Sequence, residues 1–186
     1  MLQHCDTKAD NWVLSPSDID GERINASDVM LTDFGRAIDL EALESGLSNP
    51  LDVQLKGKAS RNDMMCVAMR KDLPWSFDID TYGLCDTAHI LLFGCNMQIV
   101  RNPKTGKWGP KEVFRRYHKI ALWSKLFEEL LNLQETSMIA LGSRPGFLKE
   151  LRVLFEEHLE TNSADLKLRL KRQASVLPRD RLNGTP

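Results

Sequence analysis

The chain has 186 residues, of which 42% are apolar and 27% charged, and its formal net charge is −1. This profile is globular and excludes a disordered chain, while the balanced charge gives no bulk attraction to nucleic acid or an anionic membrane. The sequence shows no bilayer-spanning apolar run, no secretory signal and no metal-site spacing among its four cysteines. We therefore expect a soluble intracellular protein with reduced thiols.

The first part of the chain predicts short strands and loops. Apolar runs at 12–14 and 29–32 predict two short strands, and the polar stretch between them predicts a long turn. Residues 35–77 carry little sustained periodicity and predict a long irregular segment. Loops of that length are usually functional or disordered.

From residue 78 onward the pattern becomes helical. Residues 80–93 are apolar nearly all round, which predicts a helix buried through a core. A turn is expected at 102–106, and amphipathic spacing predicts three further helices, at about 122–131, 147–159 and 164–173. Residues 178–186 are expected to be disordered. Together these patterns predict one mostly helical domain with a loop-and-strand front end.

Two motifs lie at the front end. Residues 4–11 have the form H-x-D-x-K-x-x-N, with His4, Asp6, Lys8 and Asn11 at the fixed positions, and Asp33-Phe34-Gly35 follows the second strand. This combination resembles the catalytic loop and the metal-binding D-F-G turn of eukaryotic protein kinases. The strand–turn–strand between the motifs is the context that this resemblance requires. A chance occurrence of both motifs in the correct order is rare.

The resemblance to kinases implies a role for each of these residues. Asp6 would orient the substrate hydroxyl for in-line attack, and Lys8 would place its ammonium near the transferred phosphate. Asn11 and Asp33 would supply the hard oxygen ligands that suit Mg²⁺ between the phosphates of ATP.

Two further residues are expected to support the catalytic loop. His4 is better interpreted as an orienting core histidine than as a catalyst. Asp80 matches the aspartate that anchors the backbone of the catalytic loop in kinases, and a buried carboxylate requires such donors.

Longer similarities narrow the family. Cys5 stands where most kinases carry an arginine that pairs with a phosphorylated activation segment, so such pairing is not expected from this loop. The segments 63–69, 73–83 and 87–94 resemble, in order, a C-V-E-M-like segment, a P-W before an aspartate and a helix ending in L-L-F-G. This combination is similar to the Bub family of mitotic spindle-checkpoint kinases. Ala68 departs from the pattern, because the family usually has a glutamate there.

The resemblance implies an α+β, protein kinase-like fold. Residues 1–175 would form the mostly helical C-terminal lobe, with short strands around the catalytic loop and without the small N-terminal lobe, and residues 176–186 would form a disordered tail. The implied activity is that of a serine/threonine protein kinase that uses ATP and Mg²⁺ in the mitotic spindle checkpoint.

The resemblance also implies partners and a location. The substrate would be a protein, with a histone tail as the family's known target class. Kinetochore proteins and a WD-repeat Bub protein, bound through an upstream region, would be partners, and neither nucleic acid nor a membrane is expected to be contacted directly. The protein would act in the nucleus and at kinetochores, or in the cytoplasm.

Two other interpretations stay open. The Bub family has degenerate members whose kinase fold is structural, so a non-catalytic checkpoint scaffold is the main alternative; retention of Asp6, Lys8, Asn11 and Asp33 argues against it. An unrelated helical interaction domain would require both motifs to be coincidental. Because no Gly-rich loop or strand lysine precedes His4, we expect the chain not to catalyse phosphoryl transfer alone.

Overall fold

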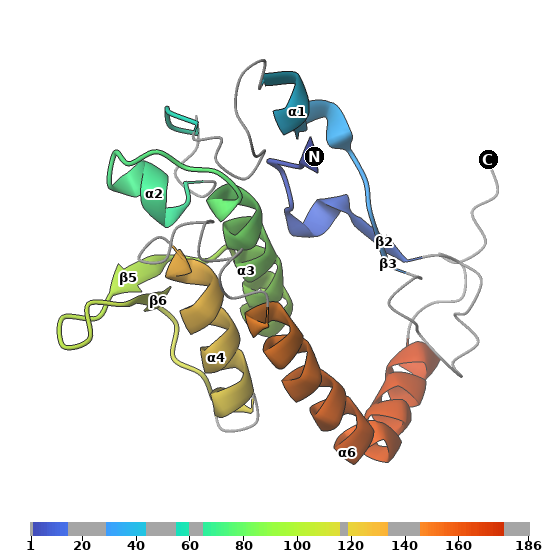
Figure 1. Ribbon diagram of the computed structural model, residues 1–186. Coiled ribbons are helices and arrows are strands. Elements are labelled where there is room, and N and C mark those ends of the chain that lie inside the picture. Colours follow the sequence, from blue (N-terminus) through green and yellow to red (C-terminus); the bar gives the residue numbers. More distant parts are fainter. Residues whose placement is uncertain are drawn as a thin grey trace.

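The computed structural model describes residues 2–14, 29–43, 55–59, 65–115, 119–133 and 146–176. Within these residues, helices dominate and the strands form three antiparallel pairs (Figure 1). The strands are β1 (Leu2–Gln3), β2 (Trp12–Leu14), β3 (Val29–Leu31), β4 (Ile38–Asp39), β5 (Ile99–Arg101) and β6 (Trp108–Pro110). The helices are α1 (Leu40–Leu43), α2 (Val67–Arg70), α3 (Asp78–Phe93), α4 (Ile120–Leu131) and α6 (Phe147–Val176), with 3₁₀ turns η1 (Ala9–Asn11) and η4 (Phe34–Arg36).

The front end contains the two strands that the sequence predicted. β2 pairs with β3 in antiparallel register, with Val13 opposite Met30. β1 pairs with β4, with Gln3 opposite Ile38. The motif residues 4–11 therefore run from one small sheet to the next. The long turn predicted between the two strands lies outside the described residues.

Residues 35–77 contain more local structure than the sequence predicted. β4, α1 and α2 lie in this stretch, and Leu55 pairs with Trp75 through two backbone hydrogen bonds of 2.8 and 2.9 Å. These elements are too short to produce a recognisable periodicity, and the bridge joins residues that are distant in sequence. Residues 44–54 and 60–64 of this stretch lie outside the described part of the chain.

α3 forms the centre of the body of the molecule, close to its predicted position. Its buried side chains include Tyr82 and Cys85, which belong to the apolar core together with Phe127 of α4. The helix runs through the core as predicted, but its apolar residues are not covered on every side, because Leu91 is 79% exposed. An apolar sequence limits how a helix can pack, but it does not specify how many neighbours cover it.

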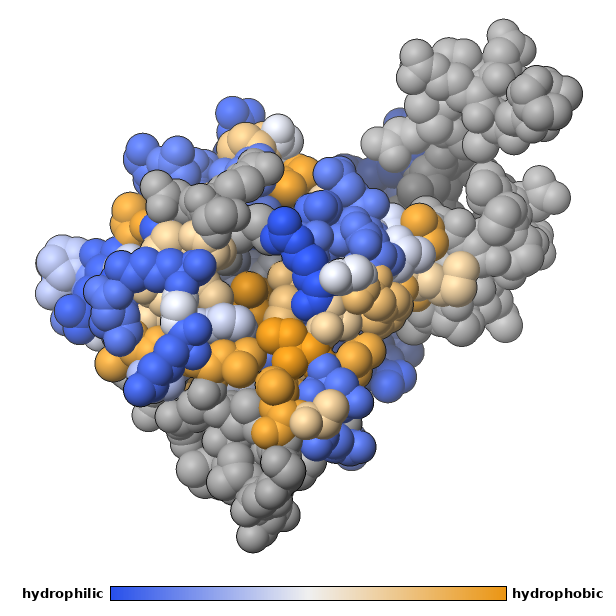
Figure 2. Space-filling model, turned by 90° about the horizontal axis from the view of Figure 1, so that it is seen from above, coloured by the Kyte–Doolittle hydropathy of each residue, from blue (hydrophilic) through white to orange (hydrophobic). Residues whose placement is uncertain are grey.

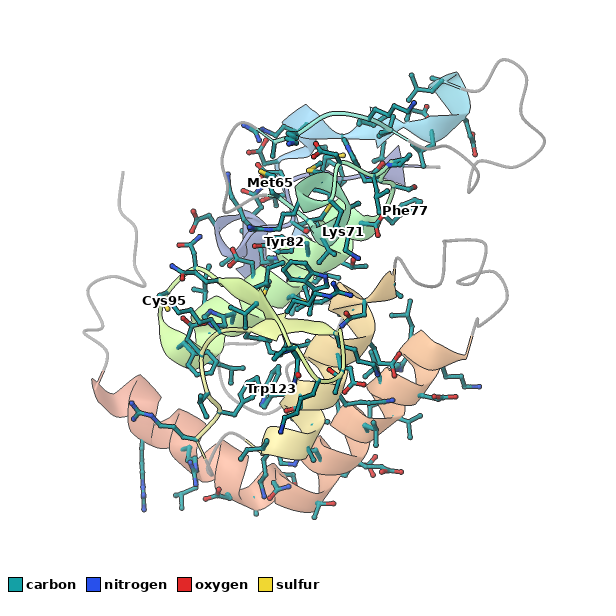
Figure 3. The ribbon with its side chains drawn as sticks, turned by 90° about the vertical axis from the view of Figure 1, so that its left-hand side faces the viewer. Met65, Lys71, Phe77, Tyr82, Cys95 and Trp123 are labelled. Carbon is teal, nitrogen blue, oxygen red and sulfur yellow. The ribbon has the colours of Figure 1, made fainter. Side chains whose placement is uncertain are left out.

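α4 packs on α3, and the hairpin formed by β5 and β6 packs on α4. The amphipathic pattern at 122–131 correctly predicted α4, which buries Phe127, Leu130 and Leu131. The turn predicted at 102–106 joins the two strands of the hairpin, whose three-residue strands the sequence did not reveal. Figure 3 views this region from the side of the hairpin, with Tyr82 and Trp123 labelled.

α6 replaces two predicted helices with one. The structure continues the helix through the polar residues between 159 and 164, where the prediction placed a break. Figure 1 shows its two halves meeting in a V. At this place Thr161 Oγ1 donates to the Glu157 carbonyl at 2.7 Å, and Asn162 Nδ2 donates to the His158 carbonyl at 2.8 Å. Side chains that bond the carbonyl four residues earlier bend helices slightly, and these bonds lie where the prediction placed the break.

Val176 is the last residue of α6, and the predicted tail beyond it lies outside the described residues, so the division at 175 stays a prediction. Among the helices that the structure describes, none combines the length and apolar character needed to cross a bilayer.

Candidate active site

The carboxylate of Asp80 holds the start of the motif loop. Asp80 lies in the first turn of α3, and its two oxygens accept hydrogen bonds from the backbone N–H groups of His4, at 2.9 Å, and Cys5, at 2.7 Å. Burial raises the pKa of the Asp80 carboxyl above its usual value, and the two backbone donors oppose part of that rise. Asp80 thus bonds the backbone of the loop, as the anchoring role predicted for it requires.

His4 orients the loop from inside. The residue is 6% exposed, its Nδ1 accepts from the backbone N–H of Asp6 at 3.3 Å, and its Nε2 lies 3.0 Å from the carbonyl oxygen of Thr32. Because Nδ1 accepts, we assign the proton of the neutral ring to Nε2, which then donates to Thr32. His4 therefore links the catalytic-loop motif to the residue before Asp33 without presenting a free nitrogen to a substrate.

Asp6, Lys8 and Asn11 come together in the loop. Lys8 Nζ donates to Asp6 Oδ2 at 3.1 Å, and Asn11 Nδ2 donates to the Asp6 carbonyl at 2.8 Å. The Asp6 side chain is 4% exposed, whereas that of Lys8 is 46% exposed. The other carboxylate oxygen of Asp6, Oδ1, is buried and has no hydrogen-bond partner among the described residues. A buried acceptor without a partner is costly unless a further group completes the site.

Asp33 lies beside Asn11 but is not buried with it. Thr32 connects them, because its backbone N–H and its hydroxyl both donate to the Asn11 carbonyl, at 2.8 and 3.1 Å. Asp33 itself is exposed, has a left-handed backbone with a φ of 61°, and accepts the Gly35 N–H at 3.4 Å. The structure thus brings Asp6, Lys8 and Asn11 into direct contact and places Asp33 at the edge of that group.

The donor set fits a magnesium ion that retains water and phosphate ligands. The Asn11 amide oxygen and the Asp33 carboxylate are hard oxygen donors, and Mg²⁺ is usually held by only one or two protein ligands besides phosphates and water. The described residues contain no group of three or more His, Cys, Asp or Glu side chains that could hold a metal without such help.

Sequence reasoning missed the contacts that seat the loop on α3. Thr7 Oγ1 donates to the Asp80 carbonyl at 2.9 Å, and Thr87 Oγ1 donates to the Thr7 carbonyl at 2.9 Å. A Cβ at Gly83 would lie 2.1 Å from Thr7 Oγ1, so only glycine fits there. The available signal was Gly83 itself, because a glycine inside a helix often marks close approach of another backbone.

Cys5 has an unusual backbone conformation for its residue type. Its φ is 62°, in the left-handed region that costs a side chain energy, and the bond from its N–H to Asp80 helps to hold it there. Burial, together with the neighbouring Asp80 and Asp6 carboxylates, raises the pKa of the Cys5 thiol to about 12. The thiol is therefore protonated at neutral pH and contributes no charge to the site.

Comparisons with known proteins agree with these motifs. No family model matches the chain. It is 31% identical, over 82% of its length, to the mitotic checkpoint serine/threonine-protein kinase BUB1 of Arabidopsis thaliana, and 34% identical, over 70%, to the spindle assembly checkpoint serine/threonine-protein kinase BUB1 of Saccharomyces cerevisiae. The matched regions make up 27% and 12% of those proteins, so the chain spans a minor part of the length of its curated relatives.

The fold is also similar to that of a Bub-family kinase domain. The crystal structure of the BubR1 kinase domain matches 83% of this chain with a TM-score of 0.59 and 27% sequence identity, and the match covers 47% of that structure. Mostly helical with a few short strands, the chain has the predicted architecture of a kinase C-terminal lobe. By sequence and by fold, it is a C-lobe-like part of a kinase domain of the Bub family of mitotic checkpoint proteins.

Proposed function

We propose that this chain is the catalytic-loop lobe of a serine/threonine protein kinase of the spindle assembly checkpoint, which transfers the γ-phosphoryl group of ATP to protein hydroxyls. The single observation that carries the proposal is the arrangement of the two oxygens of the Asp6 carboxylate. One of its oxygens is fixed by Lys8, and the other is buried without a partner. A substrate hydroxyl is a donor that would complete this site.

The residues of the loop divide the work of phosphoryl transfer. The free oxygen of Asp6 accepts the hydrogen bond of the substrate hydroxyl and aims its oxygen at the phosphorus. The half-exposed ammonium of Lys8 lies next to Asp6 and neutralises charge on the phosphoryl group during transfer. His4 and Asp80 position this loop and do not contact the reacting atoms.

Magnesium and ATP complete the proposed site. Asn11 and Asp33 are the residues that would hold Mg²⁺, which supplies charge neutralisation between the phosphates. The bond from Asn11 Nδ2 to the Asp6 carbonyl fixes the amide so that its oxygen is left for the metal. ATP binding is proposed for the full-length protein, because the matched region makes up only 27% of the Arabidopsis thaliana relative.

The proposal extends to the biological setting. The names of the similar proteins refer to the mitotic spindle checkpoint. We therefore place the activity at kinetochores in the nucleus, with a histone tail as the substrate class and kinetochore proteins and a WD-repeat Bub protein as partners of the full-length protein.

Substitution of Asp6 in the full-length protein tests the catalytic proposal. Asp6→Asn keeps the size of the side chain but weakens its acceptance of the hydroxyl proton, and we expect phosphorylation of a histone substrate to fall by about 10²–10⁴-fold. Asp10→Asn is the matched control, because Asp10 is exposed on the same loop. Unchanged phosphotransfer in Asp6→Asn would remove Asp6 from the mechanism.

One observation favours the alternative of a non-catalytic scaffold. Asp33 is exposed and contacts its own turn, so only part of the expected magnesium site is gathered. Titration of the full-length protein with ATP and Mg²⁺ separates the two functions. Binding that weakens in Asp33→Asn supports the kinase, whereas no detectable nucleotide binding supports the scaffold.

A further inference from the structure

The hairpin of β5 and β6 concentrates positive charge on a chain that is nearly neutral overall. Between residues 99 and 111 the sequence has no aspartate or glutamate, and the hairpin carries four exposed basic residues, Arg101, Lys104, Lys107 and Lys111. Figure 2 shows hydrophilic side chains gathered at the left edge, which is the side on which Figure 1 places the hairpin. The net charge of −1 therefore conceals a local separation of charge.

Two acidic side chains next to the hairpin, Glu112 and Glu128, already have partners. Glu112 Oε2 lies 2.9 Å from Nε2 of the fully buried His89, and Glu128 pairs with Lys107. Among the described residues, no carboxylate forms an ion pair with the three remaining cations, Arg101, Lys104 and Lys111. Their charge is therefore directed outward to solvent.

Hydrogen bonds give the hairpin a fixed shape. The Asn102 side chain accepts from the backbone N–H groups of Lys104, at 2.9 Å, and Thr105, at 3.2 Å. Arg101 Nε donates to the Gly106 carbonyl at 2.8 Å, which holds the guanidinium along the tip while its other nitrogens remain available. The tip therefore presents its cations from a turn that is already ordered.

The base of the hairpin is fastened to two helices. Asn132, directly after α4, accepts from the backbone N–H of Trp108 at 2.7 Å and donates to its carbonyl at 2.9 Å. Asp86 of α3 accepts the backbone N–H of Met97, just before β5, at 2.6 Å. A surface held in this way binds without paying for the ordering of a loop.

The side chains of the hairpin indicate which class of partner fits. Protein interfaces are enriched in aromatic residues and depleted in lysine, and single-stranded nucleic acid is bound through exposed aromatic rings. Trp108, the only aromatic residue of the hairpin, has a buried Nε1 and packs against the core. Lysine and arginine without exposed aromatic rings match the phosphate backbone of a duplex.

We propose that the hairpin of β5 and β6 is a docking element for the phosphate backbone of duplex nucleic acid, which it contacts without sequence preference through Arg101, Lys104 and Lys111. This inference does not depend on the catalytic proposal. It departs from the expectation that the protein makes no contact with nucleic acid, because that expectation used only the average charge of the chain.

Binding of a short mixed-sequence DNA duplex, followed by fluorescence anisotropy over a salt series, tests the proposal. Three phosphate contacts predict a slope of about −2.7 in log K against log salt, which is about a 40-fold loss of affinity between roughly 50 and 200 mM salt. The triple variant R101Q/K104Q/K111Q should lose the binding and its salt dependence. The single variant Lys104→Gln should reduce the slope by about 0.9.

A matched triple variant controls for general loss of positive charge. K125Q/K149Q/R152Q removes the same number of charges from exposed positions on α4 and α6 and should leave binding unchanged. Absence of duplex binding at low salt, or equal losses in the two triple variants, would overturn the proposal. Tighter binding to a poly-glutamate peptide than to the duplex would also overturn it and would assign the hairpin to an acidic protein. Circular dichroism of each variant verifies that the fold is retained.

Discussion

The catalytic loop and the body of the molecule are held together by different interactions. The buried residues of the loop are mostly polar, including Gln3, His4, Asp6, Thr7 and Asn11, and hydrogen bonds from His4 and Thr7 to α3 hold the loop in place. The core around α3 and α4 is mostly apolar and is filled by side chains such as Phe127. Hydrogen bonds fix direction, whereas apolar packing mainly contributes free energy. Substitutions in the loop should therefore alter geometry and activity, and substitutions in the core should mainly alter stability.

The largest expected effect on stability lies in the core. Phe127 is 1% exposed and contacts the rings of Phe114 and His89, with ring centroids 5.7 and 6.4 Å apart. Phe127→Ala should lower the free energy of unfolding by about 3–5 kcal/mol, because it leaves a cavity. Chemical denaturation measures this change. If the free energy of unfolding fell by less than it does after a surface substitution, the core would be less tightly packed than the structure indicates.

The next effect lies in the anchor of the loop. Asp80→Ala removes the acceptor of two backbone N–H groups, each worth about 1–3 kcal/mol when left unsatisfied. In the full-length protein it should also abolish phosphotransfer, whereas Phe127→Ala should leave the activity per folded molecule largely intact. Asp165→Ala, which breaks only an exposed pair with Arg169, is the control. If the Asp80 and Phe127 variants had equal specific activities, the loop and the core would not differ in their effect on activity.

The raised pKa of Asp80 adds a dependence on pH. In the folded state the carboxyl has a pKa above its ordinary value of 3.8, so folding binds protons in the pH interval between the two. The contribution of this group to stability is therefore greatest at low pH and falls as the pH rises from 3.8 through the folded-state pKa. Relative to Asp80→Asn, which cannot titrate, the wild-type chain should lose stability over this interval in denaturation at a series of pH values.

A smaller effect distinguishes two glycines. Alanine in place of glycine usually stabilises a helix by roughly 0.5–1 kcal/mol, but at Gly83 the new methyl would collide with Thr7. Gly83→Ala should therefore destabilise by about 1–3 kcal/mol and displace the loop. Gly109→Ala has open space around it and should be neutral. Thr7→Ala removes the colliding hydroxyl and with it the bond to the Asp80 carbonyl, so the double variant should be more stable than Gly83→Ala but less stable than the wild-type chain. A double variant no more stable than Gly83→Ala would show that this contact is not the source of the strain.

The smallest effect is a gain. Lys119 precedes α4 with a φ of 52°, exposed to solvent. Lys119→Gly relieves a left-handed conformation that costs about 1 kcal/mol, so thermal unfolding should occur at a slightly higher temperature. Lys125→Gly, inside α4, should instead destabilise by about 1 kcal/mol. If Lys119→Gly and Lys125→Gly lowered the unfolding temperature by similar amounts, the backbone at Lys119 would not be strained.

Local patterns in the sequence were sufficient to predict α3, α4 and the motif. The strands β2 and β3, the position of α3 and the amphipathic α4 follow from patterns within single segments. The gathering of Asp6, Lys8 and Asn11 follows from their closeness in sequence. Their catalytic roles remain predictions.

Contacts between distant segments were not predictable in the same way. The fit of Thr7 against Gly83, the exposure of Leu91 and the bridge between Leu55 and Trp75 depend on which surfaces meet, and no single window of sequence contains both partners. α6 shows a different failure, because polar residues that usually end a helix only bend this one.

The bonds between the loop and α3 also bear on the order of folding. They join residues 73 to 80 positions apart, from Thr7 and Asp80 to Thr7 and Thr87. Closing a chain segment of this length costs entropy before any contact is gained, and the ribosome releases the loop well before α3. The motif residues therefore leave the ribosome without their anchor and acquire their arrangement only once α3 has folded.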